Sequence, residues 1–243
     1  MDEGMFVELE VEEPVLIDDA ENPFTVTAFD ANHCPGAIML YFEGQFGNVL
    51  HTGDCRLSFD CLSKLPRKLT LKNGKASRDY LDCLYLDCTF GKESVKMPSK
   101  YSSVKQVLRC IWNHPSASTV YLACDLLGQE EILIEISKTF GSKIYVDKSS
   151  LPEYHAIVSV LIPELLSEET SCRFHVCEGF PRLYERAKLK FAEAEKSGQP
   201  EPLFIRPSAQ WYTCEERLEG VGSELIPSRR TQSVPKEAER DQF

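Results

Sequence analysis

Three short islands of acidic residues and histidine constrain this 243-residue chain more than any other feature. They read FDANHCPG (Phe29 to Gly36), HTGDCR (His51 to Arg56) and YLDCTF (Tyr85 to Phe90). Each comes directly after a run that predicts a β-strand, and the first run, FTVTAF, alternates and is rich in β-branched and aromatic residues. Imidazole and carboxylate groups at rigid strand ends are the donors that a metal-dependent hydrolase needs. We therefore expect His33, Asp54 and Asp87 to share a pocket, with Gly36 and Gly53 allowing tight turns beside it.

The three motifs HCPG, TGD and LDxT, in this order, resemble those of the metallo-β-lactamase-fold nucleases of the β-CASP group. The similarity is greatest to the Artemis/Apollo-like, DNA cross-link repair branch, and it covers about Phe24 to Tyr212. Each motif alone would be a weak signal. All three in order, each after a predicted strand, are far more specific.

The predicted fold class is α/β, because strands alternate with amphipathic helices after Phe90 and this favours a mostly parallel sheet. The resemblance implies a partial metallo-β-lactamase αββα sandwich with an inserted β-CASP α/β cap. The implied boundaries are 1–90 for the partial metallo-β-lactamase domain, 91–205 for the cap, 206–218 for a returning strand segment and 219–243 for a disordered tail.

The resemblance also implies roles for individual residues. His33 matches a histidine that binds the first metal, and Asp54 matches a carboxylate that bridges two metals. Asp87 matches an acidic motif that pairs with a histidine, here His175 in RFHVC, and the histidinium would protonate the leaving alkoxide of a phosphodiester. The implied cofactor is a divalent metal, zinc, with one or two ions in an intact family member. The alternative for His175 is a structural histidine within a strand.

A basic stretch lies within the loop predicted between Leu57 and Arg78. With no acidic residue between them, it holds Lys64, Arg67, Lys68, Lys72, Lys75 and Arg78. In a chain of net charge −11 this local reversal is a candidate contact to a nucleic-acid backbone. The alternative is a solvated surface loop.

Two parts of the family pattern are missing. No HxHxDH cluster precedes His33, and no histidine follows His175. His33 and Asp54 are then two donors, whereas a structural zinc site takes about four. We expect a chain truncated at both ends relative to the family and lacking the family's activity.

The implied function is a 5′-to-3′ exodeoxyribonuclease of interstrand cross-link and double-strand break repair in the nucleus, acting by metal-activated hydroxide attack on a phosphodiester. Its substrate would be single-stranded DNA or 5′-ended duplex, with DNA-repair proteins as further partners. A membrane role is not expected, since no apolar run approaches about 20 residues. Two alternatives stay open: a non-catalytic regulatory or interaction variant, and a β-CASP RNA endonuclease.

Overall fold

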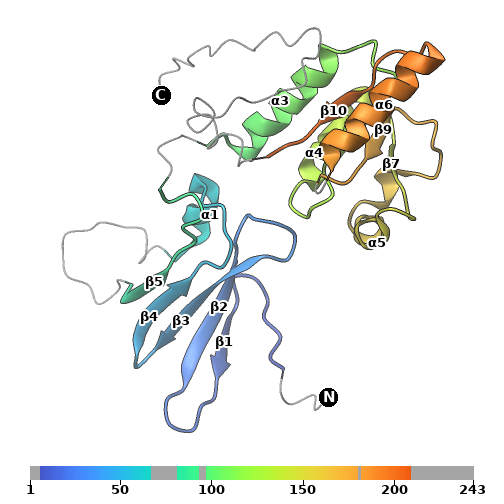
Figure 1. Cartoon of the computed structure of the whole chain (residues 1–243). Coiled ribbons are helices and arrows are strands. Elements are labelled where there is room, and N and C mark those ends of the chain that lie inside the picture. The colour runs from blue at the N-terminus through green and yellow to red at the C-terminus, as the bar shows by residue number, and fades with distance from the viewer. Residues whose placement is uncertain (1–5, 67–80, 93–96, 180–181, 209–243) are drawn as a thin grey trace. The chain divides into compact units, whose positions relative to one another are not determined.

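The computed structural model describes residues 6–66, 81–92, 97–179 and 182–208. Two five-stranded sheets, each with its own hydrophobic core, organise this part of the chain (Figure 1). The prediction of an α/β fold is confirmed. The segments predicted as a returning strand and a disordered tail lie outside the described residues, apart from 206–208.

The first sheet holds all three predicted site motifs. Its strands, in spatial order, are β1 (Pro14–Ile17), β2 (Phe24–Asp30), β3 (Ile38–Gly44), β4 (Gly47–His51) and β5 (Cys83–Tyr85). The first three pairings are antiparallel, and β4 and β5 pair in parallel. Helix α1 (Phe59–Lys64) supplies Cys61 to the core under this sheet, where Met39 and Tyr41 are fully buried.

The second sheet is parallel throughout, as the alternation of strands and helices predicts. Its strand order is β10 (Leu203–Ile205), β6 (Val120–Leu122), β9 (Phe174–Val176), β7 (Ile144–Val146) and β8 (Leu166–Ser167). Its helices are α3 (Lys100–Trp112), α4 (Glu130–Phe140), α5 (Pro152–Leu161), the short 3₁₀ turn η2 (Pro163–Leu165) and α6 (Leu183–Ser197).

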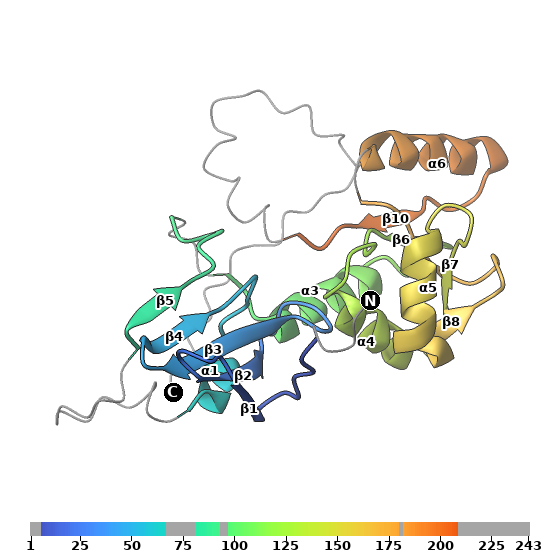
Figure 2. The same cartoon turned by 90° about the horizontal axis from the view of Figure 1, so that it is seen from below.

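Helices cover both faces of the second sheet (Figure 2). Apolar residues of α3, α4 and α5 form one core with the inward side chains of β6, β7 and β9. On the opposite face, Phe191 of α6 packs against Phe204 of β10 with ring centroids 5.8 Å apart. The residue types Ser99 and Gly141 predict a helix start and a helix end, and the structure agrees: Ser99 caps α3 through its side chain, and Gly141 closes α4 in the left-handed conformation.

Two local expectations were wrong. The alternating sequence FVELEVEEPVLI predicts one strand over Phe6–Ile17, but β1 begins only at Pro14. The extended backbone is interrupted at Glu12, whose φ of 69° lies in the left-handed region. Helix α1 also occupies the start of the predicted loop after Leu57, because Ser58 provides its N-cap. No helix among the described residues is long and apolar enough to span a membrane.

Candidate active-site edge of the first sheet

The three motifs follow strands whose carboxyl ends lie at one edge of the first sheet. His33 comes three residues after the end of β2, Asp54 three after β4, and Asp87 two after β5. Strands β4 and β5 are parallel, and β2 runs in the same direction as β4 because both are antiparallel to β3. The sheet topology therefore delivers all three segments to the same edge.

Direct contacts link the TGD and LDxT segments at this edge. The Asp87 carboxylate accepts a hydrogen bond from the backbone N–H of Cys55, the residue after Asp54, at 3.2 Å. Its other oxygen accepts from the Thr89 hydroxyl at 2.6 Å and from the Thr89 backbone N–H at 2.9 Å. These Thr89 and Cys55 hydrogen bonds lower the pKa of Asp87, and nearby His33 acts in the same direction. Asp87 is therefore an anion at neutral pH and can accept hydrogen bonds but not donate one.

Thr52 is the central residue of this junction, and its role is not predictable from the sequence alone. Its side chain is almost fully buried, with 1% of the residue exposed. Its hydroxyl donates to the Gly53 carbonyl at 2.9 Å and accepts from the backbone N–H of Asp87 at 3.0 Å, while its own N–H donates to the Tyr85 carbonyl at 2.9 Å. Only the threonine of the TGD motif itself could have pointed to this role.

The HCPG segment forms a compact turn that contacts the segment after TGD. The Ala31 N–H donates to the Ala37 carbonyl at 3.0 Å, which closes the turn, and the Arg56 N–H donates to the Ala31 carbonyl at 2.9 Å. Gly36 has φ +82° and Gly53 has φ +53°. Both glycines thus occupy the left-handed region, in keeping with the tight turns expected beside the site.

The donors at this edge match a divalent cation in type but not in number. His33 and Asp54 are both exposed to solvent, as ligands open to an incoming ion would be. Within residues 6–66, 81–92, 97–179 and 182–208, no three His, Cys, Asp or Glu side chains are placed so that they could hold a metal ion. Imidazole and carboxylate suit zinc, but zinc takes at least three protein ligands. The described residues therefore do not by themselves form a three-ligand metal site.

His175 belongs to the second sheet, in the middle of β9, whereas Asp87 follows a strand of the first sheet. Its neighbours across the parallel register are Tyr121 and Tyr145, with ring centroids 5.5 Å and 5.1 Å away. Its Nε2 lies 2.9 Å from the Cys172 carbonyl, so this nitrogen carries a proton and donates it. Burial lowers the pKa of His175, which favours the neutral ring. A catalytic role for this histidine stays a prediction.

This environment makes stability depend on His175 in a definite direction. Because its pKa is lower in the folded than in the unfolded chain, the unfolded state binds more protons as the pH falls through the ordinary value of about 6.5. We expect the free energy of unfolding to decrease as the pH falls below about 6.5, and His175→Gln to remove part of that decrease. Urea denaturation of both proteins between pH 5 and 8 measures the difference. If the free energies of unfolding of the two proteins depend on pH in the same way, His175 is not the group responsible.

Of the predicted basic contacts, only Lys64 lies within the described residues, at the last position of α1. The other five, Arg67, Lys68, Lys72, Lys75 and Arg78, lie outside them. Their proposed contact with nucleic acid remains a prediction.

The chain has a mixed α/β fold and carries HCPG, TGD and LDxT at one edge of the first sheet. This combination indicates a relative of the metallo-β-lactamase-type proteins, whose motifs these three resemble. Its relatives include Apollo and Artemis, which confirms the resemblance inferred from the motifs. The chain is 34% identical over 155 residues to the 5′ exonuclease Apollo of Gallus gallus, covering 63% of this chain and 31% of Apollo. It is 30% identical over 228 residues to Protein artemis of Gallus gallus, covering 86% of this chain and 30% of that protein.

The match to Protein artemis of Homo sapiens is similar in extent: 28% identity over 231 residues, or 88% of this chain and 32% of that protein. The chain thus spans about a third of the length of these relatives. A crystal structure of a protein of unknown function from Enterococcus faecalis V583 shares the fold, with a TM-score of 0.51 at 11% identity over 83% of this chain and 55% of that one. No protein-family model matches the chain.

Proposed function

We propose that this chain contributes to a metal-dependent 5′-to-3′ exodeoxyribonuclease of the metallo-β-lactamase/β-CASP type. The observation that supports it is the meeting of His33, Asp54 and Asp87 at one edge of the first sheet, in a chain related to Apollo and Artemis. Its substrate would be single-stranded DNA or 5′-ended duplex, its setting interstrand cross-link and double-strand break repair, and its location the nucleus.

In this proposal His33 and Asp54 are metal ligands and zinc is the preferred ion. A divalent cation in such a site supplies charge stabilisation for phosphodiester hydrolysis. The chain's own contribution is positional, because hydrogen bonds from Cys55 and Thr89 fix the Asp87 carboxylate beside the TGD segment. The half-buried, neutral ring of His175 supports a structural role for that residue more than proton donation.

The two sheets support the proposed domain boundaries. Residues 1–90 contain the first sheet and all three motifs, and 91–205 contain the parallel sheet with helices on both faces. We propose that the second unit is the β-CASP cap. The net charge of −11 requires that any DNA contact be local, and the basic stretch from Lys64 to Arg78 is the candidate.

The shortage of metal donors favours one alternative, a non-catalytic regulatory or interaction variant. Such a chain would keep the fold and the family relationship while binding metal weakly or not at all. The two possibilities differ in metal content and in cleavage, so they can be separated directly.

The test combines elemental analysis of purified protein with digestion of 5′-phosphorylated single-stranded DNA. The nuclease proposal predicts near-stoichiometric metal and trimming from the 5′ end, both lost in Asp54→Asn. Asp60→Asn is a matched control, because Asp60 is an exposed carboxylate on α1 away from the three motifs. Absence of metal and of trimming in the wild-type chain would exclude catalysis by this chain and support the non-catalytic alternative.

A further inference from the structure

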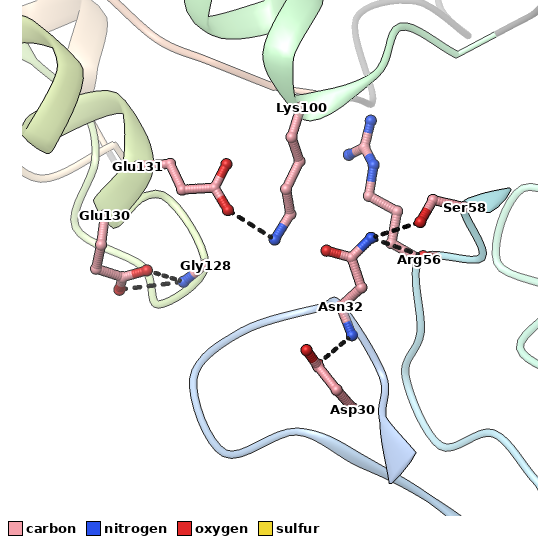
Figure 3. Close-up of polar contacts among 8 residues, drawn as sticks. All are labelled: Asp30, Asn32, Arg56, Ser58, Lys100, Gly128, Glu130 and Glu131. Carbon is pink, nitrogen blue, oxygen red and sulfur yellow. Dashed lines mark hydrogen bonds and ion pairs between the residues drawn. The ribbon is translucent and has the colours of Figure 1, made fainter. Parts of the chain in front are cut away.

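Asn32 combines two unusual properties next to the predicted ligand His33. Its φ is +54°, one of three positive values among the described residues other than glycine. Asparagine tolerates this left-handed conformation better than most residues, at a cost that surrounding contacts must offset. The backbone N–H of Asn32 donates to the Asp30 carboxylate at 2.7 Å, which stabilises the turn locally (Figure 3).

The side chain of Asn32 reaches out of this turn to the segment that follows Asp54. Its Nδ2 donates to the Arg56 carbonyl at 3.0 Å and lies 3.4 Å from the Ser58 hydroxyl (Figure 3). Ser58 in turn caps α1 by accepting from the Cys61 N–H at 3.2 Å. One amide group therefore connects the HCPG turn, the segment after TGD and the start of α1.

A backbone contact runs alongside this side-chain bridge. The Arg56 N–H donates to the Ala31 carbonyl, so Arg56 is held from both sides, by Ala31 through its N–H and by Asn32 through its carbonyl. Ala31 itself is fully buried. Asn32 adjoins His33, and Arg56 is two residues from Asp54, so this pair of hydrogen bonds fixes the spacing between the backbones that carry the two ligands.

We propose that Asn32 is a positioning residue that couples the HCPG and TGD loops and thereby sets the distance between His33 and Asp54. The hydrogen bonds alone support the coupling of the two loops, whereas the effect of Asn32 on metal binding rests on the proposed function. A glycine at this position would keep the left-handed backbone but remove the bridge. An aspartate would keep the shape and the backbone tolerance but lose the donor to the Arg56 carbonyl.

The test compares Asn32→Gly, Asn32→Asp and a control, Glu12→Gly, in the whole chain. Glu12 also has a left-handed φ, 69°, but lies before β1 and outside these loops. Hydrogen exchange followed by NMR should show the Arg56 amide, which donates to the Ala31 carbonyl, exchanging about fivefold faster in both Asn32 variants, because losing the Asn32 bond to the Arg56 carbonyl loosens this segment. The amide resonances of His33 and Asp54 should shift together. If an Asn32 variant folds and its Arg56 amide exchanges at the same rate as in the wild-type chain, the proposal is wrong.

A Zn²⁺ titration followed at the His33 side chain separates this inference from the proposed function. If the wild-type chain binds Zn²⁺, both Asn32 variants should bind it about tenfold or more weakly, as for other residues that orient ligands, and Glu12→Gly should not. If the wild-type chain shows no response to Zn²⁺, the metal-binding proposal fails while the exchange data still decide the coupling. Equal Zn²⁺ affinity of wild type and both Asn32 variants would refute the positioning role.

Discussion

Replacing Phe174 with alanine should lower the free energy of unfolding by about 3–5 kcal/mol, the usual cost of truncating a fully buried phenylalanine. Phe174 has no exposed surface and lies in β9, the central strand of the parallel sheet. It pairs with Val120 and Ile144 on the two neighbouring strands, and its ring lies 5.4 Å from that of Phe140 on α4. Removing the ring therefore leaves a cavity between Val120, Ile144 and Phe140, which are packed in place and do not fill it.

Urea denaturation followed by circular dichroism measures this loss. Val160→Ala is the control, because Val160 lies on α5 with 81% of its surface exposed and its truncation should change stability by less than about 0.5 kcal/mol. Equal effects of the two substitutions would show that Phe174 is not a core residue of a folded sheet.

Thr52→Val should lower the free energy of unfolding by about 1–3 kcal/mol, although valine has nearly the same shape. The substitution removes a buried hydroxyl that both donates to the Gly53 carbonyl and accepts from the Asp87 N–H. Two backbone groups then lose their partner in a place where 1% of Thr52 is accessible to solvent. The same change should loosen the Asp87 segment, which keeps its hydrogen bond from the Cys55 N–H.

Thr52→Ser is the matched control, since it keeps the hydroxyl and removes only a methyl group. Thermal or urea denaturation should place Thr52→Ser much closer to wild type than Thr52→Val, and the Asp87 amide should exchange faster in the valine variant alone. If both variants lose the same stability, packing of the methyl group and not the hydrogen bonds holds this junction.

The sequence predicted the regular parts of the fold well because they rest on local patterns. The β-branched and aromatic run of β2 and the helix signals at Ser99 and Gly141 are visible in the chain itself. Strand β8 was missed, since it has only two residues and forms by pairing with β7. The interruption of the strand at Glu12 was not predicted, because an alternating acidic stretch contains no signal for a positive φ.

Of the candidate site, only the residues with a motif directly after a strand could be predicted from the sequence. His33, Asp54 and Asp87 follow strands, and strand ends can be read from sequence. Thr52 and Asn32 act through hydrogen bonds to residues that are 35 and 24 positions away, and such partners are set by sheet register, which the sequence does not display.

The parallel pairing of β4 with β5 has a consequence for how the chain reaches this arrangement. The strands β2 to β4 form an antiparallel meander whose partners are close in sequence, whereas β5 pairs with β4 across a much larger separation in sequence. Local hairpins close faster than long loops, so the HCPG and TGD segments should assemble first and Asp87 should arrive last. The entropy of closing a loop grows only with the logarithm of its length, and doubling it costs about 0.6 kcal/mol. The pairing of β5 should therefore cost little more free energy than a closer pairing would, and its separation in sequence should mainly determine how quickly Asp87 reaches its place.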